Sequence, residues 1–446
     1  LERGEEGLIP WLAEDWEISE DGKEYTFKIR ENVKWQDGKL MTAEDVKFSF
    51  EYYAKYPPVT DDLGLSKDNF IETIEVLNDH TINIKVDNPN ATLLQRLGTA
   101  RIIPKHIWEN VEDPVKFLEP EAVIGCGPYK LTDYKEEQGA YRFEAFEDYW
   151  GPKQKVDVIK FIPISDELLS FENGEIDVVE VTPDVLSKYE NDPQYKIVEN
   201  PAFWGYKIAL NMEEKPEFKD KDLRQAIAYA IDQEELVEKV ARGAAKVASP
   251  GYLPVEHIWY NPDVKQYDFD LDKAKELLNG KTYDFTLLTS DSNSELRIAE
   301  LVKINLAKVG INLEIKSVDS KSRDTAIKNG EYQMALNGYG GWGGDADILR
   351  AQYANSGKGN IFDGIPGYSN EKINQLCEEQ LLEMDEAKRK DIIFKLQEEI
   401  AEEIPQIPIY NTTGHNVFKP EKYDGWKHIF DHHGLTHNKI SYLEME

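Results

Sequence analysis

Apolar and polar residues alternate over several short segments in the first part of the chain, which is the pattern of a half-buried β-strand. Tyr25, Phe27 and Ile29 would face one side of such a strand and their more polar neighbours the other. A turn is expected at residues 36–38 (QDG). Apolar segments of similar length predict further strands at residues 71–76, 81–86, 141–146 and 156–164.

One helix interrupts these strands. Thr42 is followed three residues later by Asp45, which is the spacing of a capping box at a helix N-terminus. Apolar positions at Val46 and Phe50 continue the helix, and the prolines at 57–58 prevent its extension. We therefore expect one helix between Thr42 and the two prolines.

Between about residues 220 and 410 the apolar positions recur at helical spacing. The residues of this spacing that predict one long helix ending at Gly243 are Leu223, Ile227, Ile231, Leu236 and Val240. Further helices are expected at 272–278, 295–309, 370–384 and 386–403, and strands at 283–288, 313–318 and 407–410. Helices that alternate with strands are typical of an α/β layer.

The charge of the chain excludes several classes of function. Its 446 residues include 85 acidic and 52 basic side chains, for a net charge of −33. A surface that faces phosphates needs Lys and Arg, so general nucleic-acid or anionic-membrane binding is excluded. No apolar run approaches the roughly 18–20 residues that span a bilayer. The length and the 40% hydrophobic content are sufficient for two or three globular domains.

The sequence carries none of the common catalytic motifs, such as G-x-S-x-G, H-E-x-x-H or a phosphate-binding loop. The acidic pairs at residues 378–379 and 402–403 are interpreted as solvated helix faces, because 31% of all residues are charged. Cys126 and Cys377 are too few for a disulfide framework. We expect two small buried side chains, and the sequence leaves open whether they pair.

Five of the eight histidines follow residue 414. Asp431, His432, His433 and His437 form a short group of nitrogen and oxygen donors, which suits borderline metals such as nickel or zinc. The spacing is not that of a helical ligand pair. We therefore expect polar residues of a C-terminal loop, with a metal site at His432, His433, His437 and His415 as the alternative.

The segment 338–347 (GYGGWGGDAD) has the least common composition in the chain. Its five glycines within seven residues allow close approach of a ligand to the backbone or a positive φ. The two aromatic rings offer flat apolar surface, and the aspartates accept hydrogen bonds from a cation. Ligand contact and a β-turn with inward-packed rings are both compatible with this composition.

Several motifs follow one another in a fixed order. They are PWLAEDW at 10–16, DGKEYTF at 21–27, VKWQDG at 33–38, AEDV at 43–46, GCGPY at 125–129, DYWG at 148–151, NGEIDV at 173–178 and LRQAIAYAID at 223–232. Together they cover most of the chain and resemble the extracellular solute-binding proteins of peptide, dipeptide and nickel ABC importers. Cys126 stands where this family usually has another small residue.

This resemblance implies an α/β, two-lobed periplasmic-binding-protein fold of type II, in the large cluster with an extra subdomain. Lobe I would comprise 1–20, 131–250 and 411–446, the extra subdomain 21–130, and lobe II 251–410. The lobes are expected to close over a ligand about a hinge near residues 250 and 411. Family members carry a longer segment before the first motif, so a leader or membrane anchor is expected ahead of Leu1.

The resemblance also implies binding residues. In the family's G-W-x-x-D segment the aspartate meets the α-amino group of a bound peptide, and Asp345 takes that position here, with Trp342 before it. Some peptide binders hold the peptide carboxylate with an arginine three residues before this tryptophan, where this chain has Tyr339. Arg297 is either a substitute for that arginine or an exposed helix charge. The complete set of expected ligand-binding residues is Asp345, Trp342, Tyr339, Gly343, Arg297 and Trp204.

The function that the resemblance implies is that of a receptor without catalytic activity or cofactor. It would capture oligo- or dipeptides between two closing lobes and deliver them to an ABC permease. We expect an extracellular or periplasmic monomer, attached to the membrane only through an N-terminal anchor and without nucleic-acid partners. The alternatives are a nickel, nickel-chelate or oligosaccharide receptor of the same family, and a hydrolase that uses paired carboxylates.

Overall fold

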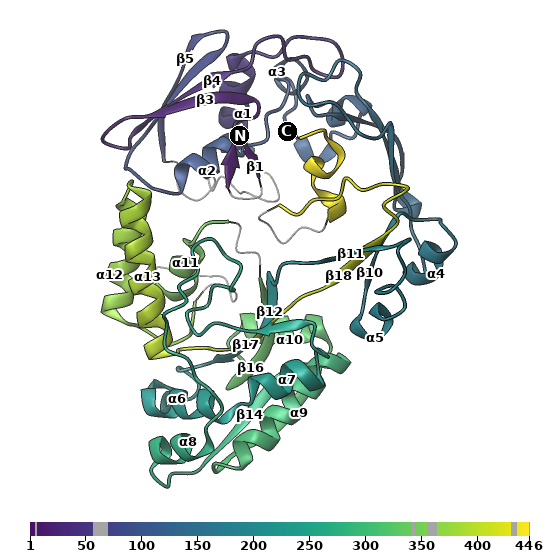
Figure 1. Cartoon of the computed structure of the whole chain (residues 1–446). Coiled ribbons are helices and arrows are strands. Elements are labelled where there is room, and N and C mark those ends of the chain that lie inside the picture. The colour runs from purple at the N-terminus through teal and green to yellow at the C-terminus, as the bar shows by residue number, and fades with distance from the viewer. Residues whose placement is uncertain (5–6, 57–69, 341–343, 355–363, 430–434, 446) are drawn as a thin grey trace. The chain divides into compact units, whose positions relative to one another are not determined.

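The computed structural model describes residues 1–4, 7–56, 70–340, 344–354, 364–429 and 435–445. The chain divides into two compact units (Figure 1). Unit 1 comprises Leu1–Ile176 together with Tyr423–Glu446, and unit 2 comprises Asp177–Lys422. The chain therefore leaves unit 1 once and returns to it at its C-terminal segment. The finer division into lobe I, an extra subdomain and lobe II stays a prediction.

Unit 1 contains an antiparallel four-stranded sheet with the order β3-β4-β6-β5. Its strands are β3 (Ala13–Ile18), β4 (Glu24–Ile29), β6 (Thr81–Val86) and β5 (Ile71–Asn78). Tyr25, Phe27 and Ile29 are buried on one face of β4, as their alternation predicts. Helix α1 (Ala43–Lys55) adds Val46 and Phe50 to the same core. Apolar burial of this kind is the main favourable term in folding the unit.

The start of α1 confirms the predicted capping box. The Asp45 carboxylate accepts a hydrogen bond from the backbone N–H of Thr42 at 2.9 Å, while the Thr42 side chain caps the first turn. The predicted turn at 36–38 is also present, with Gly38 at a φ of 92°. Pro57 and Pro58 lie outside the described residues.

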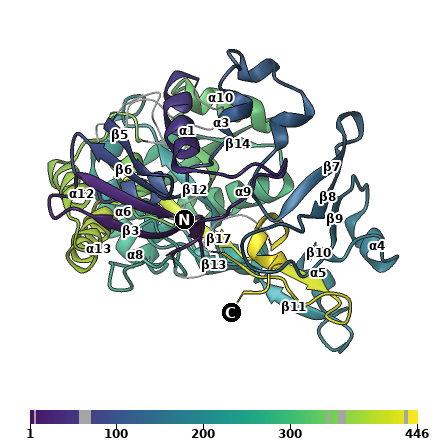
Figure 2. The same ribbon diagram turned by 90° about the horizontal axis from the view of Figure 1, so that it is seen from above.

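A second sheet of unit 1 is antiparallel, in the order β7-β8-β9. Figure 2 shows its three strands side by side. They are β7 (Tyr129–Lys135), β8 (Ala140–Ala145) and β9 (Val158–Phe161). The remaining elements of the unit are β1 (Glu2–Arg3), β2 (Leu8–Ile9), α2 (Leu93–Gly98), α3 (Lys105–Trp108) and α4 (Glu167–Glu172). The strands expected at 71–76, 81–86, 141–146 and 156–164 are thus confirmed, with shifted ends.

Unit 2 is built on a mixed six-stranded sheet with the order β13-β17-β12-β16-β14-β15. The strands are β13 (Ala245–Val247), β17 (Ile407–Thr412), β12 (Trp204–Leu210), β16 (Met334–Gly340), β14 (Tyr283–Ser290) and β15 (Ile311–Val318). The pairs β16–β14 and β14–β15 are parallel and the others antiparallel. One core of the unit includes Ile208 and Leu210 of β12 and Ile298 of helix α9 (Asn293–Ala307).

Unit 2 also contains a three-stranded antiparallel sheet and further helices. This sheet has the order β10 (Val178–Val181), β18 (His415–Phe418) and β11 (Lys196–Glu199). The helices are α5 (Pro183–Leu186), α6 (Lys221–Ala230), α7 (Gln233–Lys239), α8 (Leu271–Leu278), α10 (Ser320–Lys328), α11 (Ile348–Tyr353), α12 (Glu371–Leu382) and α13 (Glu386–Glu403). Helices α12 and α13 lie side by side (Figure 1). The helices and strands predicted after residue 270 are confirmed.

The single helix predicted over residues 223–240 is wrong, because the chain forms two helices there. Helix α6 ends at Ala230, and Ile231 has extended backbone angles (φ −94°, ψ 118°). The Asp232 side chain then caps α7 by accepting a hydrogen bond from the N–H of Glu235 at 2.9 Å. An aspartate side chain can accept backbone N–H groups and so start a new helix in place of continuing the old one. Here the cap at Asp232 ends the run of apolar residues at helical spacing as a single helix.

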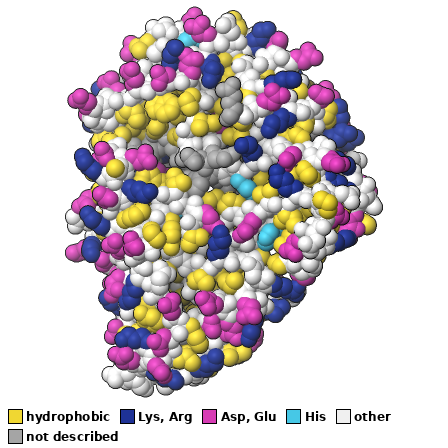
Figure 3. All heavy atoms as spheres, in the orientation of Figure 1, with side chains coloured by type: hydrophobic (Ala, Val, Ile, Leu, Met, Phe, Trp, Pro, Cys, Tyr) yellow, Lys and Arg dark blue, Asp and Glu magenta, His cyan; other side chains and the backbone are white. Residues whose placement is uncertain are grey.

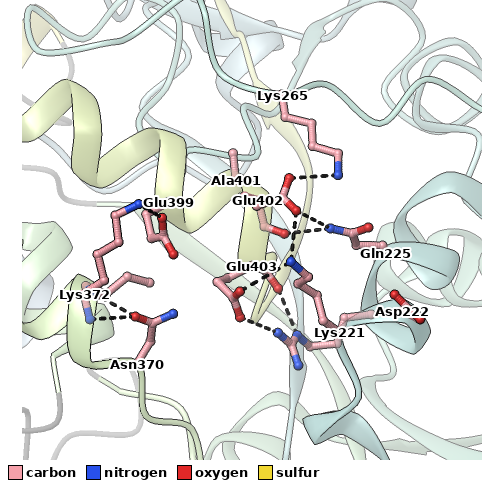
Figure 4. A network of polar contacts seen from close by, with 12 residues as sticks. Lys221, Asp222, Gln225, Lys265, Asn370, Lys372, Glu399, Ala401, Glu402 and Glu403 are labelled. Carbon is pink, nitrogen blue, oxygen red and sulfur yellow. Dashed lines mark hydrogen bonds and ion pairs between the residues drawn. The ribbon is translucent and has the colours of Figure 1, made fainter.

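Glu378 and Glu379 are exposed as interpreted, whereas residues 402–403 form a solvated face only in part, with side chains 46% and 21% exposed. Figure 4 shows Glu402 between Lys221 of α6 and Lys265, with N–O distances of 3.0 Å to each. Glu403 pairs with the buried Arg224 at 3.0 Å. Burial opposes ionisation of Glu402, but its bonds to Lys265 and Lys221 together hold its pKa below the usual value. These carboxylates join the end of α13 to α6.

The two cysteines are free thiols, Cys126 in unit 1 and Cys377 in unit 2. Cys377 is buried as expected, whereas Cys126 is half-buried. Within the described ranges, no helix has the length and apolar character needed to cross a membrane. Figure 3 shows acidic and basic side chains interspersed over the visible face.

Candidate functional site

The glycine-rich segment begins at the end of strand β16, where β16 pairs with β12. The antiparallel register places Gly340 opposite Trp204 and Tyr339 opposite Gly205. Opposed residues share a face of the sheet and successive residues alternate between the faces. Tyr339 and Trp204, both expected at the ligand site, therefore lie on opposite faces of this sheet.

The face that carries Tyr339 holds a buried cluster of aromatic and polar side chains. The ring of Tyr339 lies 5.0 Å from that of Tyr252, centroid to centroid. The ammonium of Lys207 lies 5.1 Å from the Tyr252 ring and 5.4 Å from the Tyr339 ring, which is cation–π distance. Lys207 also donates to Oε1 of Gln352 at 2.9 Å. The cluster therefore fixes a cation beneath the strand that leads into the glycine segment.

Burial governs the electrostatics of this cluster. Lys207 is only 3% exposed, and burial raises the pKa of Tyr339 well above its usual value, so its hydroxyl stays protonated. The Tyr252 hydroxyl donates to Gln352 at 2.7 Å. The side chain of Tyr339 thus has a packing role on this face. Sequence reasoning missed Lys207, although a lysine between Tyr206 and Ile208 in an apolar strand was a signal for a buried cation.

Asp345 is held by an arginine that the sequence analysis did not select. Both oxygens of its carboxylate accept hydrogen bonds from Arg389 of α13, at 2.7 and 2.8 Å. One of them also accepts the backbone N–H of Asp347 at 2.8 Å. The signal for Arg389 was its position on the buried face of α13, four residues before the buried Ile393.

The ion pair of Asp345 belongs to a longer polar network. Gln380 accepts from Arg389 and donates to Asp347 at 2.7 Å. Arg350 of α11 binds the carboxylate of Asp347 through two hydrogen bonds of 2.7 Å each. Each of these hydrogen bonds involves a charged group and is therefore strong. Together they fix the backbone of residues 345–347, which follows the glycines of this segment. Asp345 is consequently an oriented carboxylate with one lone pair on Oδ2 not used by these bonds.

A buried histidine lies in the field of Asp345. Burial lowers the pKa of His257 to about 4, and the charge of Asp345 acts in the opposite direction. The His257 ring accepts the backbone N–H of Trp259 at its Nδ1 at 3.2 Å. His257 is therefore neutral near pH 7 and contributes polarity without charge.

Trp204, another residue expected at the ligand site, is exposed. Its side chain is 51% exposed at the first position of β12. Its backbone carbonyl accepts the hydroxyl of Thr412 on the neighbouring strand β17 at 3.1 Å. The indole lies against Gly338 and Gly340 of β16, where a Cβ atom would come within 2.5 and 2.6 Å of it. The glycines of β16 thus make room for this ring.

Arg297 lies away from this arrangement. It is on the exposed side of α9 and donates from Nη2 to the carbonyl of Lys239 at 2.9 Å, at the end of α7. Among the described residues, no hydrogen bond or ion pair joins it to Asp345, Tyr339 or Trp204. Its observed contact is that of a helix-end charge. Trp342 and Gly343 lie outside the described residues.

The histidines proposed as metal ligands divide between the two units. His437 belongs to unit 1, where its ring faces Phe161 at 5.7 Å. His415 belongs to β18 of unit 2, and its buried Nδ1 has no hydrogen-bond partner among the described residues. His432 and His433 lie outside the described residues. Over the described ranges, no three His, Cys, Asp or Glu side chains are grouped closely enough to hold a metal ion.

Comparisons with known proteins identify similar chains along nearly the whole length. The family model for bacterial extracellular solute-binding proteins, family 5 Middle, matches residues 7–360, which is more than half of the chain. The heme-binding protein A of Haemophilus influenzae is 28% identical over 94% of this chain and 82% of its own. The dipeptide-binding protein of Escherichia coli is 27% identical over 96% of this chain and 85% of its own.

A solved structure shares the fold. The ABC transporter-associated periplasmic binding protein DppA from Helicobacter pylori, in complex with the peptide STSA, superimposes with a TM-score of 0.76 at 25% identity. The match covers 100% of this chain and 91% of that one. The expected α/β periplasmic-binding-protein fold is therefore confirmed.

Proposed function

Because this chain belongs to the bacterial extracellular solute-binding proteins of family 5, we propose that it is the substrate-binding receptor of an ABC importer. It captures dipeptides or oligopeptides and delivers them to the permease. The observation that carries the ligand class is the similarity to the dipeptide-binding protein of Escherichia coli over 96% of this chain. The peptide-bound neighbour with a TM-score of 0.76 supports the same class.

In this proposal Asp345 receives the α-amino group of the peptide. Arg389 and the N–H of Asp347 hold the carboxylate in one orientation, and the remaining lone pair of Oδ2 accepts the ammonium. The pairing with Arg389 keeps the carboxylate compensated before a ligand arrives, since an unpaired charge at a partly buried site is costly. Gly338 and Gly340, without side chains, make room for the indole of Trp204 beside this segment.

The glycine segment and Asp345 are thus the proposed ligand-binding region, with Trp342 and Gly343 included from the sequence. The polar cluster of Lys207, Tyr252 and Tyr339 acts as its rigid support from the opposite face of the sheet. Arg297 is not part of this proposal, because its contact with Lys239 already accounts for it.

The partners and location follow from the same role. Members of the family are substrate-binding proteins rather than enzymes, and we infer that this chain performs no catalysis. It acts outside the cytoplasmic membrane as a monomer whose membrane partner is the ABC permease, and a lipid anchor is the proposed means of attachment. Peptide binding takes precedence over the metal alternative because the similarity to the dipeptide-binding protein of Escherichia coli covers 96% of this chain.

Calorimetric titration with dialanine and trialanine tests this function. The wild-type protein is expected to bind at least one of them, and N-acetylated trialanine is expected to bind at least 10-fold more weakly, because acetylation removes the ammonium. Asp345→Asn should lower the affinity for the free peptide and bring the two affinities together. Binding of nickel or a sugar panel without binding of any peptide would overturn the assignment, and so would hydrolysis of the peptides.

A further inference from the structure

Trp204 has an environment that ordinary packing does not explain. It is the one tryptophan in the described part of the chain that is exposed, at 51%. A tryptophan carries the largest apolar surface of any side chain, so leaving it in water forgoes a large favourable burial. A polar residue in place of Trp204 at this exposed strand end would be equally compatible with folding. The exposed indole is therefore a candidate for contact with another molecule.

The indole of Trp204 packs closely on strand β16. A Cβ at Gly338 would lie 2.5 Å from Cζ2 of Trp204, and a Cβ at Gly340 would lie 2.6 Å from its Cε3. The six-membered ring thus crosses the backbone of β16 between the two glycines. Glycine weakens a strand interior relative to alanine. Two glycines beneath one ring are consistent with a close fit of the indole on the strand.

This seat covers one face of the indole and leaves the other open. A flat ring with one face against a strand and the other in solvent is expected to expose about half of its surface, in agreement with the observed 51%. The covered face fixes the height and tilt of the ring. The open face is a flat apolar surface held on a sheet, and a rigid surface of this kind costs little entropy when a ligand packs on it.

We propose that the open face of Trp204 is a subsite that stacks an aromatic side chain of the bound peptide. The inference rests on the proposed peptide-receptor function and adds a side-chain preference to it. Gly338 and Gly340, on which the ring sits, belong to the segment that leads to Asp345. An extended peptide anchored at Asp345 and running along β16 would bring one of its side chains over the indole.

The neighbours of Trp204 favour an aromatic ring over a sugar ring. A sugar needs fixed polar side chains around the platform to bind its hydroxyls. Among the described residues, those paired with Trp204 across the sheet are Gly340 on β16 and Thr412 on β17. The hydroxyl of Thr412 is already donated to the Trp204 carbonyl. An aromatic side chain needs no hydrogen-bond partner, and offset stacking on the indole stabilises its contact.

Calorimetry with matched tripeptides tests the subsite. Each position of trialanine is replaced in turn by phenylalanine or by cyclohexylalanine, which has a similar volume but no π-system. At one position the wild-type protein is expected to prefer phenylalanine by roughly 2- to 12-fold, the range that an aromatic pair adds beyond burial. Trp204→Leu keeps an apolar side chain without a flat ring, and it should reduce this ratio to about 1.

Two further variants separate the position of the ring from its presence. Gly338→Ala retains Trp204 but displaces it from the strand, and the preference should fall as it does in Trp204→Leu. Tyr134→Ala removes an exposed aromatic side chain of unit 1 and should leave the ratio unchanged. An equal preference in wild type and Trp204→Leu overturns the subsite while the peptide-receptor function stands. Failure of every tripeptide to bind the wild type overturns both.

Discussion

Arg389 of α13 and Asp345, five residues after β16, form an ion pair through two parallel hydrogen bonds of 2.8 and 2.7 Å. The guanidinium is 5% exposed and the carboxylate 20%. A pair with a buried cation depends on both partners, because removal of either one leaves a charge without compensation. The pair also ties the segment after β16 to a helix, and this helix is anchored to α6 at its other end by Glu403.

Replacement of Arg389 by methionine is expected to destabilise the protein by about 3 kcal/mol, since Asp345 is then left partly buried and unpaired. Urea unfolding of the wild type and the variant measures this loss. The double variant Arg389→Met/Asp345→Asn should recover much of it, because no lone charge remains. Lys390→Met, a substitution at the exposed neighbour, is the matched control. A double variant that loses the sum of both single effects would contradict the pairing.

The buried His257 should make the stability of the protein depend on pH. Its pKa is about 4 in the folded protein, mainly because of burial, against 6.5 in the unfolded chain. The unfolded state therefore binds an extra proton between these values, and stability falls as the pH drops from about 6.5 to about 4. The loss at the low end is about 3 kcal/mol for this group.

Unfolding free energies at about pH 7 and about pH 4.5 check this dependence in the wild type and in His257→Gln. The variant should lose less stability on acidification, while the exposed His437→Gln should behave as the wild type does. Asp345→Asn should lower the pKa of His257 further, since the aspartate charge raises it. An unchanged acid dependence in His257→Gln would refute the argument.

The sequence was sufficient wherever a local pattern decides the structure. Tyr25, Phe27 and Ile29 alternate, and they are buried on one face of β4. Thr42 and Asp45 form the capping box that their spacing predicts. The break between α6 and α7 was missed because Asp232 interrupts an apolar period that otherwise continues through it.

The site was harder to predict because its geometry depends on contacts between distant segments. The placement of Tyr339 and Trp204 on opposite faces follows from the register of β12 with β16, which no local pattern specifies. Arg389 reaches Asp345 across 44 positions of sequence. Asp345 and Trp204 were selected through the family resemblance, and their roles as ligand contacts stay predictions that the titrations above decide.

The ion pairs of Glu402 at the junction of α6 and α13 should lose their stabilising effect at low pH. Its bonds to Lys265 and Lys221 hold its pKa below 4.5, the value in an unfolded chain. The stabilisation is therefore present above pH 4.5 and is lost as the pH falls through the folded pKa. Unfolding of Glu402→Gln, followed from about pH 7 to about pH 3, should show a shallower decline than that of the wild type. Glu379→Gln, at an exposed position of α12, should retain the wild-type decline.

Strands β12 and β17 approach each other closely at Gly205. A Cβ at this position would overlap the carbonyl oxygen of Tyr410 and would lie 2.6 Å from Nδ2 of Asn411. The carbonyl is a backbone atom of the adjacent strand, so it cannot move without disturbing the sheet that carries the glycine segment. Gly205→Ala is expected to cost about 3 kcal/mol, the upper end for overpacking.

Gly127→Ala is the matched control for this substitution, because a Cβ there meets no atom within 4 Å and its φ is not in the left-handed region. It should change the free energy of unfolding by less than about 0.5 kcal/mol. The Gly205 variant should also weaken peptide binding, since Gly205 is opposite Tyr339 in the strand pair that holds the seat of Trp204. Equal stability of the two variants would mean that β12 and β17 can separate at Gly205 without cost, which their register at this position argues against.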